Sequence, residues 1–260
     1  MARAYYNEID PYAAQWLRNL IAAGHIAPGD VDTRSIADVR PDDLAGYTQC
    51  HFFAGIGGWS YAARLAGWPD ERPLWTASAP CPPWSRARIW HRAAAGEKDP
   101  RDLWPAFVPL VADRRPADLF GEQVSGRKVG PWIERAKDSL QKLGYAFSGT
   151  DRRSRDHEGP QGRERFYFSA HFGGTRGKGL VSRRGTRTAR PWRWRGEEDL
   201  RAIASAPFEP GHSWPQPLIR RSDDGVSPRV AALRAYGNAI DPYVAAEVIG
   251  AFLDAERDAA

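Results

Sequence analysis

The stretch HFFAGIGGWSYAARLAGWPDERPLWTASAPCPPWS, residues 51–85, decides the fold of this chain. It begins with an apolar run that passes through Phe53-Ala54-Gly55-Ile56-Gly57-Gly58 into a helical pattern over Trp59–Ala66. A strand that turns through glycines into a helix presents free backbone N–H groups, and these bind anionic or carboxylate-bearing ligands. The pattern indicates either a turn for a nucleotide-like cofactor or a tight strand-to-helix turn without a ligand.

The second half of the stretch places a cysteine after a strand. Leu74–Ala79 is expected to be a short strand, and it runs into Pro80-Cys81-Pro82-Pro83-Trp84-Ser85, which holds the cysteine between prolines. The chain has two cysteines, Cys50 and Cys81, so we expect no disulfide framework and a reducing compartment.

Length and charge limit the class of protein. A chain of 260 residues suits one α/β domain with a small insert. The net charge of +5 and a pI near 9.3 are compatible with a polyanionic partner. Because no signal peptide and no apolar run of membrane-spanning length is visible, we expect a soluble cytoplasmic protein without a membrane partner.

The segment before this stretch is expected to be helical. Asp10 can cap a helix that has Pro11 in its first turn and ends near Gly24, since Tyr12, Trp16, Leu17, Leu20 and Ile21 recur at helical spacing. Residues 1–46 are interpreted as an N-terminal helical flank that covers the core.

After the cysteine, strands and helices alternate. A basic segment, Arg86–Arg101, suits a loop, and Leu103–Val111 is expected to be a helix. Ala117–Phe120 is expected to be a strand that ends in Gly121-Glu122-Gln123-Val124. A carboxylate at such a strand end lies either at the crevice where α/β sheets carry their sites or merely at the cap of a turn.

The next part repeats this alternation and adds arginines. Trp132–Leu143 is an amphipathic helical pattern, and Tyr145–Thr150 and Phe166–His171 are expected to be strands. The second of these strands follows Gln161-Gly162-Arg163-Glu164-Arg165. Side chains two residues apart in a strand point to the same side, so both arginines can address one substrate.

Residues 173–227 differ from the rest of the chain in composition. They are rich in Gly, Arg and Trp, which favours contacts to phosphates and stacked bases over a loosely folded basic surface. Order returns with Gly237-Asn238-Ala239-Ile240 and a helix over Tyr243–Leu253. No Cys/His spacing of the zinc-binding kind is present, so no metal is expected.

Taken in order, these motifs resemble the DNA cytosine-C5 methyltransferase family. They are Phe53–Gly58, Pro80-Cys81, Gly121–Val124, Gln161–Arg165 and Gly237–Ile240. The resemblance covers roughly residues 48–172 and 228–253. It implies an α/β fold with the Rossmann-like sheet of S-adenosylmethionine-dependent methyltransferases, with 47–172 and 228–260 as the two parts of the catalytic domain.

The resemblance also implies the residues of the active site. Cys81 matches the nucleophile that adds to cytosine C6, Glu122 the partner of cytosine N3, and Arg163 and Arg165 the arginines that contact the base. S-adenosylmethionine is the implied cofactor. The residues implied around its methionine end are Phe53, Ala54, Gly55, Ile56, Gly57, Gly58, Pro80, Asn238 and Ala239.

Double-stranded DNA is the implied partner. The target cytosine must leave the duplex, because its ring is inaccessible in the stack. Residues 173–227 occupy the place of a small target-recognition insert. The residues expected to contact DNA are Ser85, Arg86, Arg88, Arg183, Arg184, Arg187, Arg190, Arg193 and Arg195.

Two departures from the family pattern affect the cofactor site and the cysteine loop. In the family, a strand ending in an acidic residue for the cofactor ribose and a second strand touching the adenine separate the glycine motif from the cysteine. Here Trp59–Ala66 is followed almost at once by Leu74–Cys81, so the sheet is expected to lack two strands on one side. Then Asp70, Glu71 or the N-terminal flank would supply substitute contacts, S-adenosylmethionine would bind weakly, or a partner would complete the site. Gln123 and Pro82 also replace the family's usual asparagine and glutamine.

The sequence leaves two other functions open. The chain could be a DNA-binding pseudoenzyme without a working cofactor site, or a pyrimidine-C5 modifying enzyme that uses another donor or a free nucleotide. The biological setting, restriction-modification or phage, rests on analogy alone.

Overall fold

A seven-stranded sheet forms the centre of the molecule in a computed structural model that describes residues 3–80, 102–126, 129–153, 164–173 and 239–258. The strand order is β2-β1-β3-β4-β5-β7-β6. The strands are β1 (Ala4–Asn7), β2 (Gly29–Asp32), β3 (Gln49–Phe52), β4 (Leu74–Ala77), β5 (Asp118–Val124), β6 (Tyr145–Arg153) and β7 (Glu164–Phe172). Strands β2 to β5 pair in parallel, and β7 is antiparallel to both of its neighbours. The Rossmann-like α/β class expected from the motifs is therefore confirmed.

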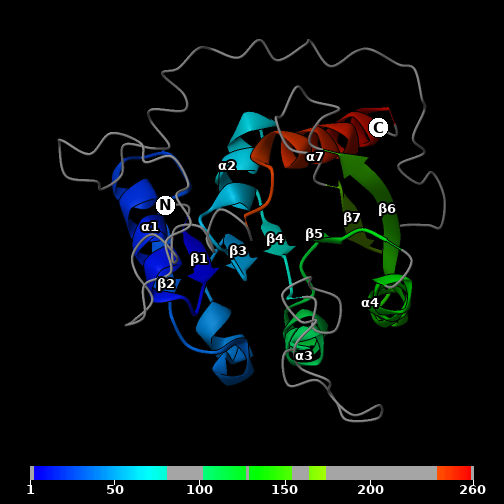
Figure 1. Ribbon diagram of the computed structural model, residues 1–260, viewed down its shortest axis with the longest axis horizontal. Coiled ribbons are helices and arrows are strands. Elements are labelled where there is room, and N and C mark those ends of the chain that lie inside the picture. Colours follow the sequence, from blue (N-terminus) through cyan, green and yellow to red (C-terminus); the bar gives the residue numbers. More distant parts are fainter. Residues whose placement is uncertain (1–2, 81–101, 127–128, 154–163, 174–238, 259–260) are drawn as a thin grey trace, which may run out of the picture.

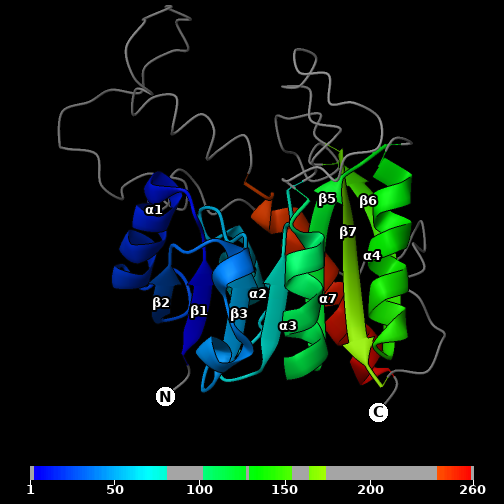
Figure 2. The same ribbon diagram turned by 90° about the horizontal axis from the view of Figure 1, so that it is seen from below.

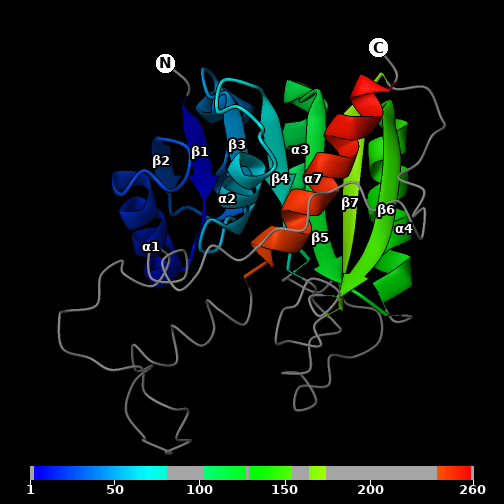
Figure 3. The same ribbon diagram turned by 90° about the horizontal axis from the view of Figure 1, so that it is seen from above.

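Helices cover both faces of this sheet (Figure 1). On one face lie α1 (Pro11–Ala22), α2 (Gly58–Leu65) and α7 (Pro242–Arg257), and Figure 3 shows α2 and α7 side by side. On the other face lie the short helices η1 (Ile36–Asp38) and η2 (Pro41–Leu44) together with α3 (Trp104–Arg114) and α4 (Gly130–Lys142), as Figure 2 shows. Successive side chains of β1 point to opposite faces of the sheet: Tyr5 packs in the core on the α3 side, and Tyr6 packs in the core on the α1 side.

Two helices begin with the same residues and the same cap. Asp10 accepts hydrogen bonds from the N–H groups of Tyr12 and Ala13, and Asp241 accepts them from Tyr243 and Val244. Each aspartate is followed by a proline in the first helical turn, where no N–H is required. The helix expected after Asp10 is thus confirmed, and it ends before Gly24, which has a φ of 73°.

The expected absence of two strands is wrong. Strand β1 pairs with β3 on the side away from β4, and β2 pairs with β1 farther out. Both strands come from the segment that was interpreted as a helical flank, so the strands precede the glycine motif in the chain instead of following it. They were overlooked because each has only four residues and the sequence of β2, GDVD, lacks the apolar character of a typical strand.

The strand order has a topological consequence. The connection β1-α1-β2 runs toward one edge of the sheet and β3-α2-β4 toward the other, yet α1 and α2 lie on the same face (Figure 1). The two connections therefore have opposite hands, and β3-α2-β4 is the left-handed one. About 98% of such crossovers are right-handed, so β3-α2-β4 is an exception to the rule.

Candidate active site

The parallel strands end along one edge of the sheet, and the candidate site is built there. Ligands of open α/β sheets bind outside the carboxyl ends of the strands. At this edge lie, in the order of the sheet, the turn after β2, the residues after β1, the glycine turn after β3, and the ends of β4 and β5. The sheet order therefore arranges motifs from distant parts of the sequence in one row.

The glycine turn has the backbone that its sequence predicts. Gly55 and Gly57 have φ angles of 56° and 85°, in the left-handed region that favours glycine, and Gly57 is the N-cap of α2. A Cβ on Gly58 would lie 2.6 Å from Cγ1 of Ile240, so a larger residue does not fit. The turn is thus held against the C-terminal motif, which brings Ala239 to this end of the sheet.

Glu8 is a candidate functional residue that the sequence analysis missed. It follows β1 directly, and its carboxylate accepts hydrogen bonds from the backbone N–H of Gly55 at 2.7 Å and of Asp10 at 2.8 Å. Burial raises the pKa of Glu8 above its ordinary value. The next residue, Ile9, is 63% exposed and stands out as a large apolar side chain at the surface. The signal that could have found the pair is the sequence AYYNEID, in which an apolar run ends in an acid.

The two acids proposed as substitutes lie elsewhere. Asp70 pairs with Arg64 at 2.7 Å, and its neighbour Pro69 accepts a hydrogen bond from Gln49, the first residue of β3. Asp70 and Glu71 therefore belong to the amino-end edge of the sheet, opposite the glycine turn. Of the alternatives that the sequence left open, the N-terminal segment is the one that places an acid at the turn.

The end of β4 leads to the cysteine motif. Trp59 of α2 donates a hydrogen bond from Nε1 to Ser78 Oγ at 2.9 Å, which ties the helix after the glycine turn to this strand end. Pro80 is exposed at the limit of the described chain, and Cys81 lies outside the described residues. Cys50, the other cysteine, is 1% exposed, and burial raises the pKa of its thiol to about 12. A buried protonated thiol is unreactive, which leaves Cys81 as the candidate nucleophile.

Glu122 and Arg165 form an ion pair beside this strand end. Glu122 lies in β5 and Arg165 opposite the end of β5 in β7, and Nε of Arg165 is 2.8 Å from Oε1 of Glu122. The side chains are 8% and 21% exposed, so the carboxylate is largely shielded from water but has a cationic partner. Gly121 makes this approach of strands possible, because a Cβ there would lie 2.1 Å from the ring of Phe168.

Gln123 connects the ends of β4 and β5. Its Nε2 donates to the carbonyl of Ala79 at 3.2 Å, and its Oε1 accepts from the N–H of Val124 at 2.9 Å. The side chain is 2% exposed. These two bonds fix the amide orientation, and they hold the carbonyl that lies two residues before Cys81. The glutamine that replaces the family's asparagine thus links the ends of β4 and β5 through its side-chain amide.

Replacing Gln123 with glutamate tests this link. The variant keeps the size of the side chain but puts a carboxylate oxygen against the Ala79 carbonyl, so the hydrogen bond is lost. We expect kcat to fall about tenfold, because one buried hydrogen bond is worth roughly the free energy that changes a rate tenfold. The affinity for S-adenosylhomocysteine, measured by calorimetry, should stay within twofold of that of the wild type. Gln49→Glu is the matched control, since Gln49 is equally buried and donates to the Pro69 carbonyl at the opposite edge of the sheet; an equal loss in both variants would contradict the assignment.

Several predicted residues lie outside the described part of the chain. No placement is given for the basic segment 86–101 or the insert 173–227. The affected site residues are Cys81, Ser85, Arg86, Arg88, Arg163, Arg183, Arg184, Arg187, Arg190, Arg193, Arg195 and Asn238. Within the described ranges, no group of three or more His, Cys, Asp or Glu side chains could hold a metal ion, and no helix is long and apolar enough to span a bilayer.

The strand order and the glycine turn define an α/β protein with a Rossmann-like sheet, which carries the buried acid–arginine pair at its carboxyl edge. Residues 68–178 match the family model of the C-5 cytosine-specific DNA methylases. The resemblance inferred from the motifs is therefore confirmed over this segment, which is similar to the DNA cytosine-5 methyltransferase family. No curated protein matches the chain.

Solved structures similar to this chain carry related descriptions. The Dnmt2 methyltransferase of S. pombe is 13% identical, with a TM-score of 0.42, and the match covers 72% of this chain and 57% of that one. A putative DNA modification methyltransferase encoded within a prophage of E. coli is 11% identical, with a TM-score of 0.38, over 66% of this chain and 47% of that one. The chain thus spans about half the length of these structures.

Proposed function

We propose that this protein transfers a methyl group from S-adenosylmethionine to C5 of a cytosine in DNA, through a covalent bond between Cys81 and C6. The observation that carries the proposal is the shielded Glu122–Arg165 pair at the carboxyl edge of the sheet, one strand away from the strand that leads to Cys81. The burial of Cys50 supports it further, because that residue is removed as a rival nucleophile.

The chemistry needs these groups because cytosine C5 is a poor nucleophile. Addition of the Cys81 thiolate to C6 converts the ring into an enamine, whose C5 can attack an electrophile. On addition, a protonated Glu122 donates its proton to N3, where negative charge develops, and takes it back when the thiolate leaves. Arg165 holds the carboxyl group and is positioned toward the base. After C5 has gained the methyl group, loss of its proton and of the thiolate restores the aromatic ring.

The carboxyl edge suits an adenosyl cofactor. S-adenosylmethionine supplies the electrophilic methyl group when it is bound. A carboxylate after the strand next to a glycine turn is placed for ribose hydroxyls, as in dinucleotide-binding sheets, and Glu8 stands there 2.7 Å from the Gly55 N–H. Ile9 offers an apolar surface for a base. The N–H groups of the glycine turn and the beginning of α2 suit the carboxylate of the methionine end.

DNA is the proposed substrate because of charge and composition. The chain carries 37 basic against 32 acidic residues, and the segment 173–227 interleaves arginines with tryptophans. Arginine contacts to phosphates and aromatic stacking on bases give affinity for polynucleotides. A cytosine in a duplex must be flipped out to reach Cys81.

Nucleoside mass spectrometry tests the proposal and its rivals together. DNA and RNA from cells that express the full chain, and from cells with an empty vector, are digested to nucleosides and compared. We expect 5-methyldeoxycytidine to increase in DNA. A gain in 5-methylcytidine of RNA would reassign the substrate, another mass on the pyrimidine would point to a different donor, and no change would support a pseudoenzyme.

A further inference from the structure

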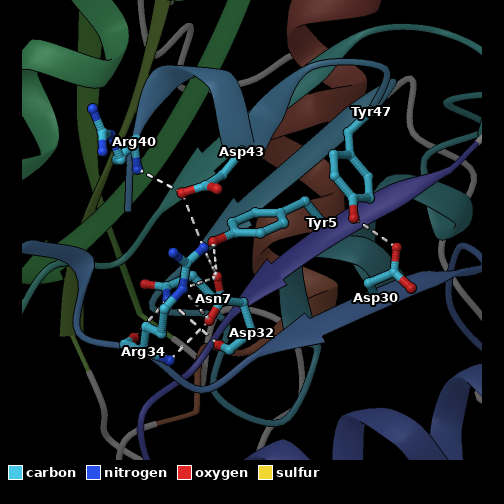
Figure 4. Close-up of polar contacts among 8 residues, drawn as sticks. All are labelled: Tyr5, Asn7, Asp30, Asp32, Arg34, Arg40, Asp43 and Tyr47. Carbon is cyan, nitrogen blue, oxygen red and sulfur yellow. Dashed lines mark hydrogen bonds and ion pairs between the residues drawn. The ribbon is translucent and has the colours of Figure 1, made fainter. Parts of the chain in front are cut away.

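Strand β2 carries two matching clusters, one at each end (Figure 4). At the amino end, Asp30 accepts a hydrogen bond from the hydroxyl of Tyr47 at 2.6 Å and pairs with Arg3 at 2.7 Å. At the carboxyl end, Asp32 accepts one from the hydroxyl of Tyr5 at 2.6 Å and pairs with Arg34 at 2.7 Å. The two clusters have the same chemistry, but only the second lies at the edge of the candidate active site.

The carboxyl-end cluster is the more extensive of the two. Asp32 also accepts from the backbone N–H and from Nε of Arg34, and the guanidinium reaches on to Asp43 at 3.0 Å. Although partial burial opposes it, the hydrogen bonds from Arg34 and Tyr5 hold the pKa of the Asp32 carboxyl below its ordinary value. Asp32 accepts five hydrogen bonds in all, which fills the lone pairs of its two oxygens, so the carboxylate is not available to a ligand.

The contacts of the cluster fix the turn that follows β2. Asn7, which is 3% exposed, donates from Nδ2 to the carbonyl of Arg34 at 2.9 Å, and Asp43 also accepts from the backbone N–H of Arg40. Residues 33–35 are therefore held from β1 by Asn7 and from η2 by Asp43. The Arg34 side chain is 45% exposed, so its ion pairs contribute little to the free energy of unfolding. Their main effect is on where the turn lies.

The turn 33–35 follows β2, which lies next to β1 in the sheet, so the turn is next to Glu8 along the carboxyl edge. Under the proposed function, Glu8 after β1 contacts the ribose and the methionine end points toward β4 and Cys81. The base must then extend to the other side of the ribose, which is over the end of β2. The residues that follow β2 at this edge are 33–35, the turn that Asn7 and Asp43 hold.

We propose that Arg34, clamped between Asp32 and Asp43, is a positioning residue that holds the turn 33–35 as the wall of the adenine pocket. The proposal rests on the proposed function. It assigns Asp32 no direct contact with the cofactor, and it predicts that the cluster acts on binding of the adenosine end and not on the chemical step.

Arg34→Ala tests this role against the matched variant Arg3→Ala. Calorimetry on the full chain measures the affinity for S-adenosylhomocysteine and for 5′-methylthioadenosine, which lacks the amino-acid end. We expect Arg34→Ala to weaken both ligands by about tenfold, through a shifted turn, and to raise KM for S-adenosylmethionine by the same factor with kcat within twofold. Arg3→Ala should leave all of these values unchanged, and Arg34→Lys, which cannot form the bidentate pair, should lie between.

The outcomes separate this proposal from the proposed function. If the wild type binds S-adenosylhomocysteine and Arg34→Ala binds it equally well, the positioning role is overturned and the proposed function stands. Equal losses in Arg34→Ala and Arg3→Ala, with equal drops in Tm, would overturn it in favour of a structural role. If the wild type binds neither adenosyl ligand, both proposals fail.

Discussion

A Cys81→Ser variant is expected to lose methyl transfer almost completely, by about 10⁴-fold or more in kcat, which is the scale of losing a covalent nucleophile. The serine hydroxyl is much less ionised than a thiol near neutral pH, so addition to C6 is too slow to activate C5. Affinity for S-adenosylhomocysteine should remain within about twofold, because under the proposed function the cysteine contacts the base and not the adenosine. Methylation of DNA with tritiated S-adenosylmethionine measures the loss.

Trapping of a covalent adduct tests whether Cys81 forms the bond to the cytosine. DNA with 5-fluorocytosine at the target position cannot lose the fluorine at C5, so the wild type should form an adduct that survives denaturing electrophoresis and Cys81→Ser should form none. Cys50→Ala is the matched control: it removes a thiol that is 1% exposed in β3, and it should keep the adduct. An adduct that persists in Cys81→Ser and disappears in Cys50→Ala would overturn the assignment of the nucleophile.

The sequence predicted the central and C-terminal parts of this architecture well. Asp10 and Pro11 predict the start of α1, because they form its N-terminal cap and first turn. The glycine spacing predicts the turn before α2. Both signals are local in the sequence. Glu122 was expected at a strand end near the crevice, and the structure places it in the C-terminal half of β5 beside Arg165. The pairing of these two residues depends on β7 returning antiparallel to β5, which no local signal encodes.

The N-terminal strands β1 and β2 could not be predicted from their local sequence. β1 is apolar but too short to show a period, and β2 has one apolar residue, Val31, among charged ones. What makes β1 a strand is its pairing with β3, a segment that lies more than 40 positions beyond Ala4 in the chain, and β2 in turn pairs with β1. Motif order was informative over residues 68–178, which match the family model, and it misled at the N-terminal segment, where β1 and β2 precede the glycine motif.

Glu8 decides whether this rearranged order builds a working cofactor site. Removing the side chain in Glu8→Ala should weaken S-adenosylhomocysteine binding by about a hundredfold, since a hydrogen bond to a charged group is worth about 1.5–3 kcal/mol and a ribose offers two hydroxyls. Glu8→Gln keeps an acceptor for the Gly55 N–H and should show a smaller loss, which separates the contact with the ribose from support of the glycine turn.

Glu71→Gln is the matched control, because it neutralises an exposed acid that follows the glycine helix in the chain, where the family's order would place the ribose-binding residue. Calorimetry on the full-length variants should give wild-type affinity for Glu71→Gln. Since Glu71 lies at the opposite edge of the sheet from Gly55, an effect there equal to that of Glu8→Ala would mean that the cofactor does not bind along the carboxyl ends of β1 and β3. Selective loss with Glu8→Ala would instead establish that a strand encoded before the glycine motif supplies the acid that the family encodes after it.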